Sequence, residues 1–85
     1  MVRPVRVLLF ATARAAVGRS ELDWAVPASG VSSRALTDQL AAAYPQLAPT
    51  LRVSRLVRNG EYIDRPTTRI RPGDEFAVHP PYGGG

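Results

Sequence analysis

The stretch Pro72-Gly-Asp-Glu-Phe-Ala-Val-His-Pro-Pro-Tyr-Gly-Gly-Gly85 closes the chain and decides its fold. It opens with proline, glycine and aspartate, which are typical of a turn. Its middle, residues 75–79, alternates in a way that predicts a strand. The two prolines that follow resist helix and sheet, so they force an extended exit from that strand. We therefore expect a folded domain over residues 1–79 and an extended tail over residues 80–85.

The tail has a distinctive chemistry because it ends in Gly83, Gly84 and Gly85. Glycine has no Cβ and fits a channel too narrow for other residues, so this terminus could enter another protein's active site. Its carboxylate is ionised at neutral pH and must be activated before it reacts, most simply as an acyl-adenylate made from ATP. The sequence has no nucleotide-binding motif, which assigns that step to another enzyme. A frayed terminus is the alternative interpretation.

The first half of the chain predicts four elements. A β-branched apolar run over residues 5–10 predicts a strand, and an alanine-rich run over residues 11–17 predicts a short helix that stops at Gly18. Alternation over residues 21–26 predicts a second strand, antiparallel to the first because the link is short. Ser32 is expected to cap the main helix. The apolar stripe of that helix consists of Leu36, Leu40, Ala43 and Tyr44.

The second half predicts the rest of a sheet. A proline ends the main helix, and an irregular link then carries Leu47 and Leu51 into the core. Residues 53–58 predict a strand, Asn59-Gly60 a tight turn and Tyr62-Ile63 a short return strand. This order predicts an α+β fold, a ubiquitin-like β-grasp roll in which a mixed sheet packs on one main helix. The final strand of such a roll leads directly into the tail.

Composition limits what the chain can do. It has 85 residues, 45% of them hydrophobic and 21% charged, which predicts one small globular domain. No cysteine is present, so the terminal carboxyl is the only place where this chain could carry sulfur. With one histidine and seven acids, the sequence does not predict a dedicated metal site. No apolar run approaches the roughly 20 residues that a transmembrane helix needs. We expect a cytoplasmic protein with no membrane partner and no bound metal or cofactor of its own.

The basic residues are all arginine. The net charge is +4, but the 11 arginines are spread along the chain and no aromatic RNA-binding motif accompanies them. We therefore expect no nucleic-acid partner, although a β-grasp RNA-binding module remains an alternative. Lysine is absent, so the N-terminus is the only primary amine that this chain could offer to an activated Gly85.

One apolar surface is predicted outside the core. Leu8 and Phe10 alternate with the residues that pack on the helix, which leaves them for the other face of the sheet. With Tyr62 and Ile63 of the hairpin, they are expected to form a partner interface. A second core edge is the competing explanation. His79, at the end of the last strand, is either a pH-sensitive edge contact or a solvent-facing side chain.

Three motifs together resemble the small subunit of molybdopterin synthase. They are Phe10-Ala11-x-x-Arg14-x-x-x-Gly18, Arg58-Asn59-Gly60-Glu61, and Pro72-Gly73-Asp74-Glu75 with the terminal Pro80-Pro81-x-x-Gly84-Gly85. The resemblance covers essentially the whole chain. Proteins of this family are ubiquitin-like sulfur carriers that act in molybdenum cofactor biosynthesis, within a heterotetramer formed with the large subunit.

The resemblance implies a role for the tail. An adenylating enzyme similar to ubiquitin-activating enzymes would use ATP to activate Gly85, and a sulfurtransferase or desulfurase would supply sulfur for a thiocarboxylate. The tail would then enter the large synthase subunit and donate sulfur to a cyclic pyranopterin phosphate. Gly84 would be the slim neighbour that fits the channel, and the chain would be a non-catalytic donor. The tail residues expected at the partner interface are His79, Pro80, Pro81, Tyr82 and Gly83.

Departures from the family pattern leave open which biosynthetic pathway, the client of the carrier, receives the sulfur. His79 stands where an apolar residue is usual, and Tyr82 and Gly83 also differ from the commonest tails. Tyr82 is either a groove anchor or an exposed ring. Related carriers serve thiamine, cysteine and tRNA thiolation, and a modifier that forms isopeptides is a further alternative.

Overall fold

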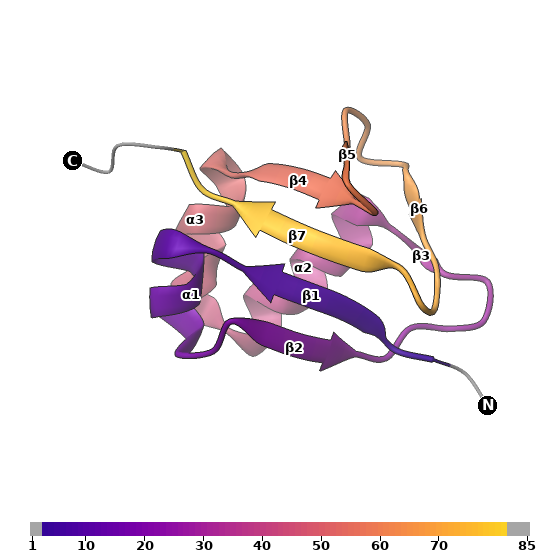
Figure 1. The fold of residues 1–85 in the computed structure, drawn as a ribbon, viewed down its shortest axis with the longest axis horizontal. Coiled ribbons are helices and arrows are strands. Elements are labelled where there is room, and N and C mark those ends of the chain that lie inside the picture. The colour runs from indigo at the N-terminus through magenta and orange to yellow at the C-terminus, as the bar shows by residue number, and fades with distance from the viewer. Residues whose placement is uncertain (1–2, 82–85) are drawn as a thin grey trace.

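Five strands form the main sheet in the order β2-β1-β7-β4-β5 (Figure 1). A computed structural model describes residues 3–81. The central strands β1 and β7 run parallel, and every other neighbouring pair is antiparallel, including β1 and β2 as expected. The strands are β1 (Val5–Leu9), β2 (Glu21–Trp24), β4 (Arg55–Arg58), β5 (Glu61–Tyr62) and β7 (Glu75–His79).

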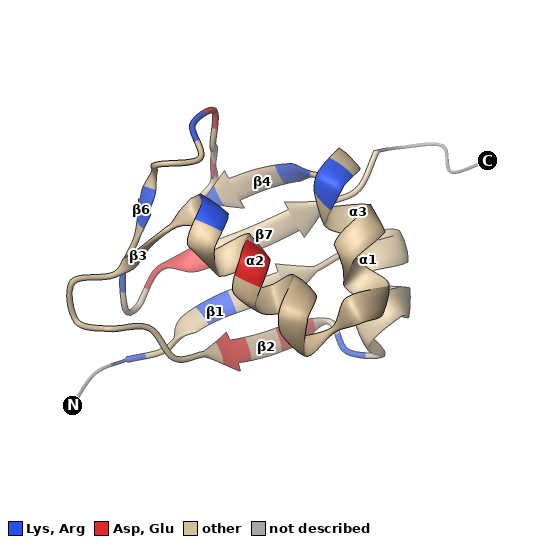
Figure 2. Ribbon diagram, turned by 180° about the vertical axis from the view of Figure 1, so that it is seen from behind, with Lys and Arg blue, Asp and Glu red and all other residues tan. Residues whose placement is uncertain are grey.

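The helices cover one face of this sheet and leave the other face open (Figures 1 and 2). The longest helix is α2 (Ser33–Ala43), and Ser32 caps it as expected, because its Oγ accepts the Ala35 amide proton at 3.0 Å. The shorter α1 (Ala11–Val17) ends at Gly18, whose φ of 83° closes the helix. The core between the layers is apolar, and its fully buried side chains include Val5, Val7, Leu9, Leu36, Leu40, Leu47, Ile70, Phe76 and Val78.

The link after α2 is helical, which corrects the expectation of an irregular segment. It contains a 3₁₀ turn, η1 (Pro45–Leu47), and then α3 (Ala48–Val53). The proline ends α2, but it also opens η1, because its fixed φ suits a first helical turn. Leu47 and Leu51 enter the core as predicted.

Four strand boundaries and one stripe residue in the sequence prediction were wrong. The first strand, predicted over residues 5–10, ends at Leu9, so Phe10 lies outside it. Val53 closes α3, and its side chain is 62% exposed, so the strand predicted there starts only at β4. The second strand stops at Trp24 and not at residue 26, and the return strand is β5 and not Tyr62-Ile63. Ala43 is exposed at the end of α2 and does not join the apolar stripe. Each error lies at the end of an element, where local pattern is weakest.

A second, two-stranded sheet pairs β3 (Val31–Ser32) with β6 (Arg69–Ile70). The sequence did not predict it, because two residues cannot display an alternating pattern. Within residues 3–81, no helix is long and apolar enough to cross a bilayer.

Candidate functional site

The open face of the sheet carries an apolar stripe across four strands. Leu8 of β1 and Val57 of β4 both align with Ala77 of β7, and Tyr62 of β5 stands opposite Val57. Since alternate residues of a strand share a face, these four side chains lie side by side. Tyr62 is 68% exposed.

An aromatic pair lies where the tail leaves the sheet. The rings of Phe10 and His79 are stacked with centroids 4.5 Å apart and an interplanar angle of 16°. Phe10 directly follows β1, and Ala11, with a φ of 49°, turns the chain away into α1. This turn leaves the Phe10 ring 42% exposed on the open face. The stacked pair therefore includes the residue that directly precedes the first tail proline.

Arg55 joins the pair to the stripe. It is aligned with His79 in the register of β4 and β7. Its guanidinium carbon lies 5.1 Å from the centroid of the Tyr62 ring, a cation–π geometry. One continuous patch results, which we call the open-sheet surface. It consists of Leu8, Phe10, Arg55, Val57, Tyr62 and His79 around Ala77, which is itself buried.

The structure brings most of the predicted interface residues together. Leu8, Phe10, Tyr62 and His79 share the open-sheet surface, and their role as a partner interface stays a prediction. Ile63 does not join them, because its side chain packs against the core and its amide donates to the Leu56 carbonyl at 2.8 Å. The predicted site residues Tyr82, Gly83, Gly84 and Gly85 lie outside the described residues, while Pro80 is half-buried and Pro81 exposed. Sequence reasoning missed Arg55, Val57 and Ala77, which alternation around Leu56 and Phe76 could have indicated.

Two motifs of the family resemblance form a structural clamp. The Asn59 side chain donates to Asp74 Oδ1 at 3.1 Å, and its Oδ1 accepts the Glu75 amide proton at 2.8 Å. Asp74 Oδ2 accepts the Arg71 amide proton at 2.8 Å and lies 3.3 Å from Arg58 Nε. These contacts hold the β4–β5 turn against the turn that starts β7. The clamp therefore positions the strand from which the tail leaves.

The clamp also sets the ionisation of Asp74. Burial raises the pKa of its carboxyl, but the Arg71 amide, the Asn59 side chain and the Arg58 guanidinium outweigh burial and hold the pKa below its ordinary value of 3.8. The unfolded chain thus binds this proton more tightly than the folded chain does. The stabilisation by Asp74 is complete above the unfolded pKa and is lost as pH falls through the lower, folded pKa.

We expect Asp74→Asn to lower the free energy of unfolding at neutral pH by about 1–2 kcal/mol, because it weakens a half-buried charged network. The variant should also lose part of the decline in stability between about pH 5 and pH 2. Urea unfolding of both proteins across that range measures both effects. Asp38→Asn is the matched control, since Asp38 forms an exposed pair with Arg34. Equal losses in the two variants would contradict the clamp.

Residues 3–81 contain no group of three His, Asp or Glu side chains arranged to hold a metal ion. What they do present is a mixed, helix-backed sheet with an exposed aromatic surface at the root of a glycine-ended tail. Fold and site together define a ubiquitin-like β-grasp protein, which confirms the expected fold class.

The chain belongs to the ThiS family, whose family model matches residues 7–85. It is 36% identical over 86 residues to a molybdopterin synthase sulfur carrier subunit of Dictyostelium discoideum, with 100% of both chains covered. It is 32% identical to the protein of the same description from Chlamydomonas reinhardtii, covering 95% of this chain and 98% of the relative. The family resemblance seen in the sequence is thereby confirmed.

Solved structures share the fold. Small archaeal modifier protein 1 from Haloferax volcanii superimposes with a TM-score of 0.76 at 28% identity, covering 95% of this chain and 98% of that one. A chain from the complex of subunits 1 and 2 of the molybdopterin-converting factor of Helicobacter pylori matches with a TM-score of 0.67 at 22% identity. The match covers 95% of this chain and 97% of that one. At that identity the second likeness shows the fold alone.

Proposed function

We propose that this chain is the sulfur-carrier subunit of a molybdopterin synthase. The observation that carries the proposal is full-length similarity to two sulfur carrier subunits at more than 30% identity. The open-sheet surface supports it, because a tail that enters another protein needs a docking surface at its root. The cytoplasm, where ATP is available, is the proposed location.

The chemistry takes place on the carboxylate of Gly85. In the first step this carboxylate attacks the α-phosphate of ATP on an adenylating enzyme, which forms the acyl-adenylate and releases pyrophosphate. Sulfide-level sulfur, delivered as hydrosulfide by a sulfur donor, then attacks the acyl carbon, displaces AMP and leaves a terminal thiocarboxylate. In the large subunit, that sulfur passes to a cyclic pyranopterin phosphate, and water restores the carboxylate. The chain's own residues bind and aim the tail, while the acid–base groups belong to the partners.

Mass spectrometry tests this proposal directly. The intact chain, incubated with ATP, an adenylating enzyme and a sulfur donor, should gain about 16 Da as one oxygen is replaced by sulfur. The product should then convert cyclic pyranopterin phosphate in the presence of the large subunit. A thiocarboxylate that donates instead to thiamine, cysteine or tRNA precursors would assign a different client.

A protein modifier is the second candidate. The likeness to small archaeal modifier protein 1, at 28% identity, favours it. Because this chain has no lysine, any conjugates could not form chains through its own side chains. Conjugates on other proteins that survive reducing denaturation, without a thiocarboxylate intermediate, would support this candidate over the first.

We expect Phe10→Asp to weaken binding to the large subunit by more than about 1 kcal/mol and to leave the monomer folded, since an exposed aromatic anchor is removed. Calorimetric titration gives the affinity, and circular dichroism reports the fold. Val53→Asp is the control, because Val53 is also exposed but lies on α3, away from the open-sheet surface. Unfolding of Phe10→Asp would place Phe10 in the core, and equal weakening by both variants would rule out a specific interface.

A further inference from the structure

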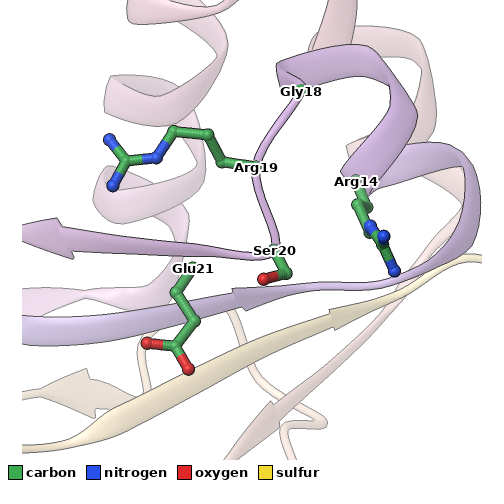
Figure 3. Close-up of a pocket in the computed structure, with 5 residues that line it drawn as sticks. All are labelled: Arg14, Gly18, Arg19, Ser20 and Glu21. Carbon is green, nitrogen blue, oxygen red and sulfur yellow. The ribbon is translucent and has the colours of Figure 1, made fainter.

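A hollow lies between the end of α1 and the start of β2. It measures about 460 Å³ and is lined by Arg14, Gly18, Arg19, Ser20 and Glu21 (Figure 3). A neighbouring depression of about 270 Å³ shares three of these residues and extends to Leu8 and Phe10. The hollow is therefore continuous with the open-sheet surface.

Arg14 is the motif residue that the fold leaves unexplained. Gly18 closes α1, and Phe10 stacks on His79, so those two motif positions have clear roles. Over residues 3–81, by contrast, the side-chain hydrogen bonds and ion pairs involve other residues and none uses the Arg14 guanidinium. The remaining internal role is electrostatic, because a cation in the last turn of a helix is mildly favourable.

The charges around the hollow favour an anion. Its one carboxylate, on Glu21, lies 3.8 Å from Arg6 and is partly neutralised by it. The Arg14 and Arg19 side chains extend to opposite sides of the connection, and Ser20 lies between them (Figure 3). The planar guanidinium fork of Arg14 matches the two oxygens of a carboxylate.

We propose that Arg14 is a docking residue that binds an acidic side chain of the large subunit. The large subunit is the partner because the hollow continues the surface on which that subunit would sit, so this inference rests on the proposed function. A charged contact beside an apolar anchor fixes orientation and rejects partners that present a basic residue there. Arg14 thus selects the partner and aims the tail, and it takes no part in the sulfur chemistry.

Binding of the full chain to the large subunit, measured by calorimetry at two salt concentrations, tests the inference. Arg14→Gln is expected to raise Kd roughly tenfold, and Arg14→Glu more, with a shallower salt dependence in both. Arg14→Lys keeps the positive charge at the end of α1 but loses the fork, so it should recover only part of the affinity. Arg52→Glu is the matched control, an arginine-to-glutamate change on α3, and should leave Kd within about twofold.

Three results would overturn this inference and leave the proposed function intact. They are wild-type affinity for the large subunit in Arg14→Gln, full recovery of that affinity in Arg14→Lys, or equal weakening of binding in Arg52→Glu. Full recovery of affinity in Arg14→Lys would mean that Arg14 acts only through its positive charge at the end of α1. Weakened binding to the adenylating enzyme with unchanged binding to the large subunit would likewise reject the proposed partner. If the wild-type chain did not bind the large subunit at all, the proposed function itself would be wrong. Should Arg14→Glu not fold, the glutamine and lysine variants decide the question.

Discussion

Adding one residue after Gly85 is expected to abolish sulfur transfer. The added residue moves the carboxylate about 3.5 Å beyond its reactive position, and a misplacement of about 1 Å can already cost a hundredfold in rate. Replacing Gly84 or Gly85 with a bulkier residue should act in the same direction, because it adds a Cβ where the channel admits none. Intact mass and a single-turnover transfer assay measure the two steps separately.

Two controls distinguish a loss of sulfur transfer from a loss of folding stability. A chain that lacks Gly83 to Gly85 should keep its melting temperature, since residues 3–81 already complete the sheet and the core, while losing all transfer. Gly83→Ala should be milder than either terminal change, because it lies further from the reacting atom. An extended chain that is thiocarboxylated and donates sulfur at the normal rate, without prior proteolysis, would refute the donor-tail proposal.

Gly30→Ala is expected to be among the most destabilising single changes in the body of the protein. Gly30 has a φ of 81°, and a Cβ built there would lie 2.5 Å from the backbone oxygen of Ile70. Ile70 is fully buried and pairs with Val31 across the small sheet, so it cannot withdraw without disturbing the core. Backbone strain and this overlap together should lower the free energy of unfolding by about 2–4 kcal/mol.

Gly18→Ala is the matched control for that experiment. Gly18 has a similar φ of 83°, but nothing lies within 4 Å of an added Cβ. It should therefore lose only the strain of the left-handed conformation, about 1 kcal/mol. Urea unfolding of both variants isolates the overlap as their difference. Equal losses would mean that the β3–β6 sheet moves aside without cost.

Much of the candidate site followed from alternation alone. The alternation of Leu8 and Phe10 with core residues predicted their place on the open face, because side chains of a strand point to opposite sides. The same logic failed for Ile63, since β5 ends one residue earlier than predicted and the side chain turns to the core. The stacking of Phe10 on His79 could not be predicted, because it joins the residue after β1 to the last residue of β7, which are distant in sequence.

The sequence by itself determined the elements that local chemistry specifies. Ser32 caps a helix and Asn59-Gly60 turns a hairpin, because each depends on conformational preferences of neighbouring residues. Only the tertiary structure decided what the family motifs do. Asn59 and Asp74, 15 residues apart, bond to each other and so act within the fold, whereas Arg14 is left facing a hollow. Such long-range pairing depends on how whole elements pack, and no local pattern encodes it.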